Sequence, residues 1–304
     1  MSGETMKVRH RVSNEIFLMK NVDRESYWAE AFLCELEHLQ LLKNHSNIIR
    51  LIEAFNFGRL SYMVVEHFPS NLWEFILKNE IPKSYVQSFT YQICRGVSHC
   101  HEKSIMLRNI MPSNIFVTSN LWIKIGDLSL SKTAKNSRVF SSIKVGALEY
   151  RAPELLFAEI IGKHYCNYTM AIDVWSVGVS FLTIATRKLS LRGSDAKTMF
   201  NCIIEALGTP TSREWQSMDP NYTEHRKEIE EIAPEIRRSG LWKALCSYLE
   251  CEEIYFAKEF LRYNPKLRIS IFATLNHKYF DENNFNKLAL PTGQWDGTKA
   301  VFIN

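Results

Sequence analysis

The chain has 304 residues, enough for one large domain or two lobes around a sizeable core. Hydrophobic residues make up 46% and aromatic residues 12%, which excludes disorder of the chain as a whole. The formal charge of +4 is only mildly basic, and the basic residues form short groups such as Lys7–Arg9–Arg11. Because nucleic-acid binding requires a clustered basic stripe, we expect no nucleic-acid partner.

The cysteine pattern and the hydrophobic runs point to an intracellular protein. The seven cysteines form neither CxxC pairs nor an even framework, which is typical of reduced thiols in the cytosol or nucleus. The segment MSGETMKVRH is polar and has no apolar core of a signal peptide. The most hydrophobic run, residues 171–186, is short for a membrane span and carries Asp173, so we interpret it as a buried helix.

The first 68 residues are predicted to be rich in β-structure. Residues 8–22 suggest two short strands around a turn at Ser13 and Asn14, because β-branched and aromatic residues flank it. Residues 25–43 carry apolar side chains at helical spacing. Residues 47–55 and 60–68 then predict two further strands.

Beyond Pro69 the pattern becomes helical. Residues 70–80 predict a helix capped by Ser70, and residues 83–103 a long amphipathic helix. Strand-like segments follow at 115–117 and 121–126, and residues 150–280 are mostly helical. We therefore predict an α+β protein with a β-rich N-terminal lobe (1–68), a large helical lobe (69–280) and a polar tail (281–304).

Several motifs, in order and at consistent spacing, resemble those of eukaryotic protein kinases. They are RNIMPSN (108–114), GDLSLSK (126–132), VGALEYRAPELL (145–156) and IDVWSVG (172–178). The segments LGTPTSREW (207–215) and LRYNPKLRISIFATLNHKYF (261–280) resemble those of cyclin-dependent kinases within the CMGC group. The resemblance covers roughly residues 14–280 and implies one bilobal protein-kinase-like domain.

Part of the machinery for phosphoryl transfer is retained under this resemblance. Lys20 matches the lysine that binds the α- and β-phosphates, and Glu35 matches its carboxylate partner, with Glu37 as the alternative. Asp127 and Asn114 match the two Mg²⁺ ligands, although both residue types are also common at turns. The resemblance also implies nucleotide-binding positions at Leu18, Glu66, Phe68 and Phe116.

The group that would perform the chemistry has changed. Asn109 stands at the position of the catalytic Asp, beside Arg108, and a neutral amide cannot act as a base. Met111 replaces the lysine that would neutralise the transferring phosphoryl group. Ala147 replaces the threonine that would bond to both. Three changes around one reaction centre indicate a relaxed demand for catalysis.

The nucleotide side of the cleft is altered as well. The 19 residues before Lys20 contain one glycine, Gly3, so the glycine-rich loop of the family is missing from this N-terminal lobe unless the chain starts further upstream. Leu18 takes the place of a small alanine, and Phe116 that of a smaller aliphatic residue. We expect these two side chains to fill the adenine slot from opposite faces.

The scaffold and a regulatory segment complete the resemblance. Leu39, Leu107, Leu128 and Asp173 match a hydrophobic stack and its anchor, while Glu154 and Arg268 match a buried ion pair. Alignment of the segment between Asp127 and Glu154 places Ser142 at the activating phosphorylation site, with Arg108 and Lys132 as cations. The third arginine of that cluster is Cys34 here, and the segment can equally be an ordinary solvated loop.

Two hypotheses for the function follow. The first is a cyclin-dependent-kinase-like pseudokinase with impaired catalysis that acts as a regulator or scaffold in signalling or cell-cycle control. The second is a divergent but active Ser/Thr protein kinase that uses Mg-ATP as its cofactor; the first needs none. A kinase for small molecules fits poorly. We expect a protein partner or substrate, with a cyclin-like subunit among the candidates, no membrane association, and a location in the nucleus or cytoplasm.

Overall fold

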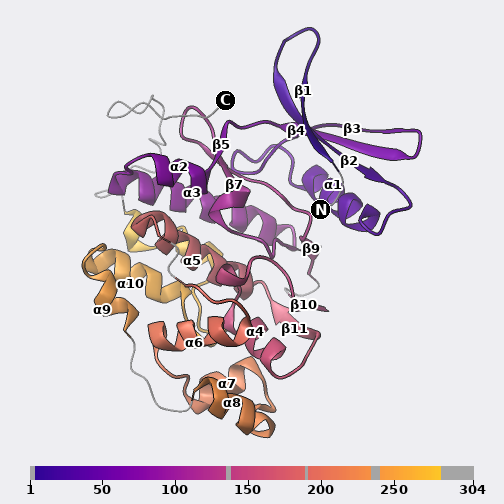
Figure 1. The fold of residues 1–304 in the computed structure, drawn as a ribbon. Helices are drawn as coiled ribbons and strands as arrows, with labels where there is room; N and C mark the ends of the chain where they lie inside the picture. Colours follow the sequence, from indigo (N-terminus) through magenta and orange to yellow (C-terminus); the bar gives the residue numbers. More distant parts are fainter. Residues whose placement is uncertain (1–3, 135–137, 189–190, 234–239, 282–304) are drawn as a thin grey trace.

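The computed structural model describes residues 4–134, 138–188, 191–233 and 240–281. The predicted tail at 281–304 lies outside this part except for Asp281. Figure 1 shows a bilobal molecule, with a β-sheet lobe above a larger helical lobe. The small lobe holds β1 (Thr5–Arg9), β2 (Ile16–Asp23), α1 (Ala29–Leu41), β3 (Leu51–Phe57) and β4 (Leu60–Glu66). The α+β bilobal fold predicted from the sequence is confirmed.

The small lobe is one antiparallel sheet in the order β1-β2-β4-β3. The β1–β2 hairpin runs in register from Thr5 opposite Lys20 to Arg9 opposite Ile16, and it extends away from the body of the molecule in Figure 1. Asn14 in its turn has a φ of 57°, a left-handed conformation that Asn tolerates better than most residues. The two strands predicted around Ser13 and Asn14 are therefore present.

The large lobe is built mainly from helices and also contains several short strands. Its α-helices are α2 (Leu72–Lys78), α3 (Lys83–Glu102), α4 (Pro153–Ile160), α5 (Ala171–Thr186), α6 (Ala196–Leu207), α7 (Ser212–Met218), α8 (Arg226–Ile232), α9 (Leu241–Leu245), α10 (Cys251–Phe260) and α11 (Ile271–Thr274). Its short strands are β5 (Ser70–Asn71), β6 (Ile105–Met106), β7 (Ile115–Val117), β8 (Ile123–Ile125), β9 (Lys132–Thr133), β10 (Arg138–Ser142) and β11 (Tyr165–Thr169). Single 3₁₀ turns lie at Pro112–Asn114, Leu148–Tyr150, Tyr222–His225 and Lys278–Phe280.

The cap of α2 differs from the prediction. The expected cap was Ser70, but the side chain of Asn71 accepts the hydrogen bond from the backbone N–H of Glu74. Asn is at least as good a cap as Ser, and Ser70 instead belongs to β5, which pairs with β7. Sequence alone placed the helix start one residue early, within the usual error for a helix boundary.

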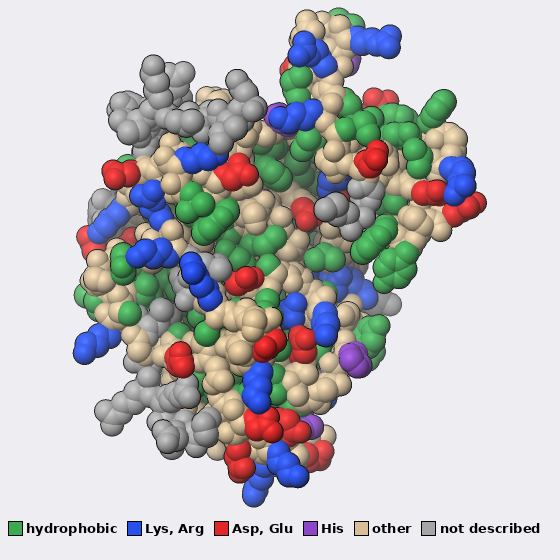
Figure 2. All heavy atoms as spheres, viewed as in Figure 1, with side chains coloured by type: hydrophobic (Ala, Val, Ile, Leu, Met, Phe, Trp, Pro, Cys, Tyr) green, Lys and Arg blue, Asp and Glu red, His purple; other side chains and the backbone are tan. Residues whose placement is uncertain are grey.

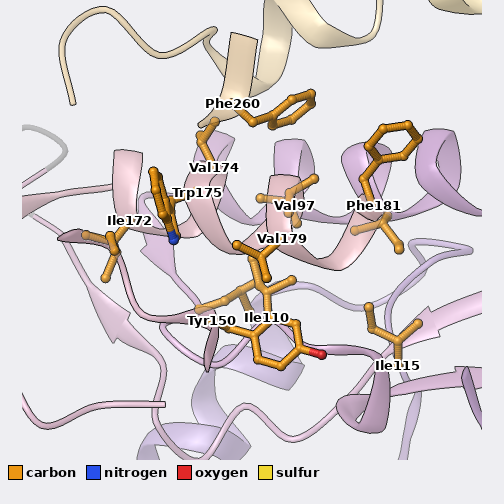
Figure 3. Close-up of a cluster of buried hydrophobic side chains, with 14 of the residues drawn as sticks. Val97, Ile110, Ile115, Tyr150, Ile172, Val174, Trp175, Val179, Phe181 and Phe260 are labelled. Atoms are coloured by element: carbon orange, nitrogen blue, oxygen red, sulfur yellow. The ribbon is translucent and has the colours of Figure 1, made fainter. Parts of the chain in front are cut away.

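The central helix α5 organises the core of the large lobe. Its side chains project both toward Phe260 of α10 and toward Ile110 and Tyr150 (Figure 3). Trp175 and Phe181 are each at most 1% exposed. Gly178 permits the close approach of α10, because a Cβ at this position would lie 2.4 Å from the Cβ of Phe260. The apolar run with Asp173 is thus a buried helix, as predicted.

The two lobes are joined by polar contacts between the loop after α1 and the large lobe. The amide nitrogen of buried Asn47 donates to Gln92 (3.1 Å) and to the carbonyl of Ile123 (2.9 Å). His45 in the same loop stacks on His99 of α3, with ring centroids 4.5 Å apart. Burial, helped by nearby His99, Arg95 and Lys124, lowers the pKa of His45 from 6.5 to about 4.

A buried ion pair fastens the start of α4 to the segment before α11. Arg268 donates to both carboxylate oxygens of Glu154, at 2.7 and 2.6 Å. Its other N–H groups donate to the carbonyls of Arg262, Ala171 and Tyr263, so that all five donors are used. The Arg268 side chain has no exposed surface. The paired geometry predicted for Glu154 and Arg268 is present.

A two-stranded ribbon that we did not predict connects the loop after Asp127 to the approach to α5. Strands β10 and β11 pair over five residues, from Arg138 opposite Thr169 to Ser142 opposite Tyr165. Residues 150–280 were predicted to be mostly helical, and β11 interrupts that pattern. The sequence YCNYT of β11 is rich in residues favoured in strands, which was the available signal.

The cysteines, the helices and the surface add three observations. None of the seven cysteines forms a disulfide. Across the described ranges, every helix is too short or too polar to cross a lipid bilayer. In the view of Figure 2, Lys and Arg side chains gather at the tip of the β1–β2 hairpin, whereas acidic and basic side chains mix around α7 and α8.

We predict that His45 makes the stability of the protein depend on pH. Its folded-state pKa lies below its ordinary value, so between pH 6.5 and about 4 the unfolded chain binds a proton that the folded chain does not. The contribution of His45 to the free energy of unfolding is therefore fully present above pH 6.5 and is lost as the pH falls toward 4. His45→Gln should flatten the thermal midpoint against pH in this window, whereas the exposed His164→Gln should not. Identical profiles for the two variants would contradict this.

We also predict a large cost for breaking the Glu154–Arg268 pair. Glu154→Ala leaves a buried guanidinium without its counter-ion, which costs about 3–5 kcal/mol of unfolding free energy. Urea titration followed by tryptophan fluorescence measures this loss. The matched control is Glu231→Ala, which removes an exposed carboxylate paired with Lys197 and should cost much less. Equal losses in the two variants would show that the pair is not needed for stability.

Candidate functional site

The ion pair predicted on the small lobe is formed. Lys20 Nζ on β2 lies 2.7 Å from Glu35 Oε1 on α1, and the Glu35 side chain is only 4% exposed. Glu35 Oε1 also accepts a hydrogen bond from the backbone N–H of Leu128 (3.3 Å). The alternative partner, Glu37, lies on the exposed face of α1. The pair therefore connects β2, α1 and the DLS segment at one point.

The loop that carries Asn109 is held by Asp173 at the start of α5. The fully buried carboxylate of Asp173 accepts hydrogen bonds from the backbone N–H groups of Leu107 and Arg108, both 2.8 Å, and from His101 Nε2 at 2.9 Å. Leu107 is itself buried, as are Leu39 and Leu128, the other members of the predicted hydrophobic stack. All three belong to one continuous core.

Asn109 turns its amide group toward Asp127. Asn109 Nδ2 donates to Asp127 Oδ2 at 3.2 Å. The backbone carbonyl of Asn109 accepts a hydrogen bond from Asn114 Nδ2 at 3.1 Å. The other oxygen of Asp127 accepts from the Ser129 hydroxyl at 2.7 Å. Asp127 has a φ of 52°, a left-handed conformation that Asp adopts more readily than most residues. Sequence reasoning placed three of these residues together but missed Ser129.

This arrangement lacks the groups for general-base catalysis at its centre. The amide of Asn109 has no proton-accepting group near neutral pH, and its N–H is already donated to Asp127. Met111 packs partly buried against the hydrophobic core, and so does Ala147. The position where a cation would stabilise the transferring group is therefore occupied by an apolar side chain.

The two residues that the resemblance assigns to Mg²⁺, Asp127 and Asn114, are both oxygen donors of the kind that this ion takes. Mg²⁺ prefers six oxygens and anionic ligands, and it loses its waters reluctantly. Here Asp127 contributes one carboxylate whose two oxygens already accept hydrogen bonds, and Asn114 contributes one amide oxygen. Among the described residues, no cluster of three or more His, Cys, Asp or Glu side chains could hold a metal ion. A site built on Asp127 and Asn114 would leave its other positions to water and phosphate oxygens, as is usual for Mg²⁺, and their role as ligands stays a prediction.

The cleft between the lobes is open. It has a volume of about 750 Å³ and is lined by Glu4, Thr5, Met6, Leu18, Lys20, Glu35, Ile49, Val65, Phe116 and Asp127. Leu18 and Phe116 stand in its walls, so the expectation that they fill it is wrong for the cleft as a whole. The Phe116 ring covers Gly126 and stacks on Phe68, with centroids 5.7 Å apart.

Glu66, predicted to bind nucleotide, has other partners. Its carboxylate pairs with Lys124 at 2.9 Å and with Arg50 at 3.3 Å. Phe68 stacks on Phe116, which lines the cleft. Of the predicted nucleotide-binding residues, Lys20, Glu35, Leu18 and Phe116 line the cleft, while Glu66 is directed to its two cations.

The segment after Asp127 places Ser141, and not Ser142, beside the two predicted cations. Arg108 Nη1 donates to Ser141 Oγ at 3.0 Å, and Lys132 Nζ donates to the same oxygen at 3.3 Å. The Ser142 hydroxyl instead accepts from the backbone N–H of Lys144. The pairing of β10 with β11 sets this register, because alternate residues of a strand face opposite sides. Phosphorylation in this segment stays a prediction.

The same segment is also fastened without any phosphate. Arg108 Nη1 donates to the hydroxyl of Tyr168, on β11, and Arg108 Nε donates to the carbonyl of Leu130 at 2.6 Å. The Tyr168 hydroxyl in turn donates to the carbonyl of Ser142. Cys34, at the position of the family's third arginine, donates its thiol to the carbonyl of Ser131, and burial raises the pKa of this thiol. Neutral hydrogen-bond acceptors therefore satisfy the guanidinium of Arg108.

His38 is a contact that sequence reasoning missed. It lies on α1, is 3% exposed, and its two ring nitrogens are within hydrogen-bond distance of the Ser131 hydroxyl (2.7 Å) and the Thr133 hydroxyl (3.1 Å). Ser131 donates to the carbonyl of Leu128, so His38 Nδ1 donates to Ser131 and Nε2 accepts from Thr133. Burial lowers the pKa of His38, which favours this neutral form. In the sequence, the signal for this contact was a His at helical spacing from Glu35.

Comparison with known proteins agrees with this geometry. The family model of the protein kinase domain matches residues 1–280. A relative from Dictyostelium discoideum, named as a cyclin-dependent serine/threonine-protein kinase, is 30% identical over 229 residues, or 73% of this chain. The chain spans 33% of that relative's length.

A solved structure shares the fold. A chain of the yeast RNA polymerase II CTD kinase complex CTDK-1 superposes with a TM-score of 0.81 at 22% identity, covering 92% of this chain and 90% of the other. This likeness concerns the fold alone. Because the family model matches nearly all of the described residues, the chain belongs to the protein kinase family, and within that family it resembles the cyclin-dependent kinases.

Proposed function

We propose that this member of the cyclin-dependent-kinase-like Ser/Thr kinase family has lost phosphotransfer and acts as a regulatory or scaffolding protein in signalling or cell-cycle control. The observation that carries the proposal is the Asn109 amide, which donates to Asp127 from the position where a base would accept the proton of the substrate. An amide cannot exchange these roles, since it has no protonation equilibrium near neutral pH.

The size of the defect supports the proposal. Proton transfer to a positioned general base contributes about 10²–10⁴-fold to a rate. Loss of a preorganised group that stabilises developing charge costs roughly another 10²–10³-fold, and Met111 supplies no such group. The two deficits concern the same step, and they leave positioning as the only aid to transfer.

The parts needed for binding are retained. The core, the Glu154–Arg268 pair and the Asp173 anchor are complete, so the large lobe offers a rigid surface to a partner. The small lobe exposes large aromatic side chains, with Tyr27 at 88% and Phe57 at 76%. The yeast structure is named as a kinase complex, which supports a protein partner, with a cyclin-like subunit as one candidate. We place the protein inside the cell, in the nucleus or cytoplasm.

A second candidate is a divergent, active Ser/Thr protein kinase. The formed Lys20–Glu35 pair, the presence of Asp127 and the open cleft of about 750 Å³ favour it, because these features serve nucleotide binding. In that case Mg-ATP would be the cofactor and a protein Ser or Thr the substrate.

We predict no transfer of radiolabelled phosphate from ATP to the protein itself or to a generic protein substrate above the level of Asp127→Ala. Autoradiography with Mg²⁺ or Mn²⁺ present measures this. Asp127→Ala is the matched control because it removes the carboxylate that any transfer in this fold would need. Incorporation by the wild type that is lost in Asp127→Ala would overturn the proposal and establish the second candidate.

A further inference from the structure

The outer edge of β1 is open in the part of the chain that the structure describes. The sheet order β1-β2-β4-β3 gives β1 a single neighbour, β2. Two backbone hydrogen bonds at the ends of the ladder show which residues bond to that neighbour. Asn21 N donates to the carbonyl of Glu4 at 3.0 Å, and His10 N donates to the carbonyl of Glu15 at 2.9 Å. Both pairs fit the register of the strands between them.

Three residues of β1 therefore turn their backbone groups away from β2. Hydrogen-bonded pairs alternate along an antiparallel ladder, so Met6 and Val8 bond to β2, whereas Thr5, Lys7 and Arg9 point outward. Within the described ranges, no backbone hydrogen bond reaches these outward groups. A row of unpaired N–H and C=O groups of this kind is the template on which a further strand pairs.

The side chains on one face of this edge are cationic. Lys7 and Arg9 are both exposed, and each lies opposite an apolar residue of β2. Neither forms a salt bridge with a described residue. The acids nearest in sequence, Glu4 and Glu15, belong to the hydrogen-bonded pairs and so lie on the other face of the hairpin. The face that carries Lys7 and Arg9 thus lacks a counter-charge along β1.

These charges select among the strands that could pair with the edge. A second copy of this chain, paired antiparallel through β1, would set Lys7 opposite its own copy or opposite Arg9, and like charges directly opposite are destabilising. A strand with acidic side chains at alternate positions would instead place them opposite both cations. The strand at the other end of the sheet, β3, carries Glu53 and no basic residue, so it does not share this preference.

We propose that the outer edge of β1 binds an extended acidic segment of a partner protein, which adds a fifth strand to the four-stranded sheet. Main-chain hydrogen bonds to Thr5, Lys7 and Arg9 give the pairing, and the two cations select the acidic side chains. Because Glu4, Thr5 and Met6 line the cleft, the added strand lies along the rim of the cleft. This surface goes beyond the proposed function, since its pairing groups are present whether or not the protein transfers phosphate.

Fluorescence anisotropy of a labelled peptide tests the proposal on the whole chain. The peptide has about eight residues and alternates Glu with Val, so that it spans one strand. We expect it to bind, and we expect the double variant Lys7→Glu and Arg9→Glu to bind about tenfold more weakly, because two attractions become repulsions. The matched control, Arg226→Glu with Lys227→Glu, makes the same charge change on exposed residues of α8 and should bind as the wild type does.

The backbone of the peptide gives a second test that needs no variant of the protein. The same peptide N-methylated at every residue keeps its charges but has no N–H to donate, and it should not bind. Hydrogen exchange followed by NMR reads the protein side. In the free protein the amides of Lys7 and Arg9 should exchange faster than those of Met6 and Val8, and the acidic peptide should slow them.

Several results would overturn the proposal. They are the absence of peptide binding, equal affinity of the two double variants, and binding of the N-methylated peptide. A dimer in sedimentation velocity that Thr5→Pro abolishes would assign the edge to a second copy and overturn the acidic partner, since this change removes an outward N–H and leaves the ladder with β2 intact. None of these measurements reads phosphotransfer, so failure here and failure of the proposed function are separately visible.

Discussion

The carboxylate of Asp173 is the constraint on which the site depends. It is completely buried at the start of α5, and it holds the backbone of Leu107 and Arg108 together with the ring of His101. A buried carboxylate requires such partners, because removing it from water is costly unless its lone pairs are satisfied. Through Arg108, the same anchor fixes the segments at Leu130, Ser141 and Tyr168. Asp173 therefore fixes the backbone of the catalytic loop, independently of the hydrogen bonds that the Asn109 side chain makes.

Because of this dependence, the loop keeps its shape without a carboxylate at position 109. Asn109 and Asp have nearly the same shape, and the amide gains a hydrogen bond to Asp127 where a carboxylate would repel it. An unsatisfied polar group away from water would cost free energy, and here Asn109 Nδ2 and both oxygens of Asp127 have hydrogen-bond partners. Met111 and Ala147 add apolar contacts to the core at positions where the family resemblance implies a lysine and a threonine. Stability and chemistry are thus separable at this site.

Prediction from the sequence succeeded where local pattern and a strong physical requirement coincide. The pairs Lys20–Glu35 and Glu154–Arg268 were identified through the family resemblance, and the buried helix around Asp173 was identified from its apolar run. The ribbon of β10 and β11 was missed, since five-residue strands that pair across more than twenty residues have little local signature. The choice between Ser141 and Ser142 depends on that same register. The open cleft was missed because the position of Phe116 follows from Gly126 and Phe68, which a sequence does not place.

The bridge from His38 to Ser131 and Thr133 has a thermodynamic consequence for the whole molecule. Helix α1 carries both Glu35, at the cleft, and His38, at the beginning of the segment that leads to the β10–β11 ribbon. A ligand that moves α1 changes the free energy of that segment, and coupling between two sites is reciprocal. If a ligand in the cleft shifts α1, a partner bound at the ribbon would alter the affinity of the cleft by the same factor. Coupling of this kind, through α1, would operate whether or not the protein transfers phosphate.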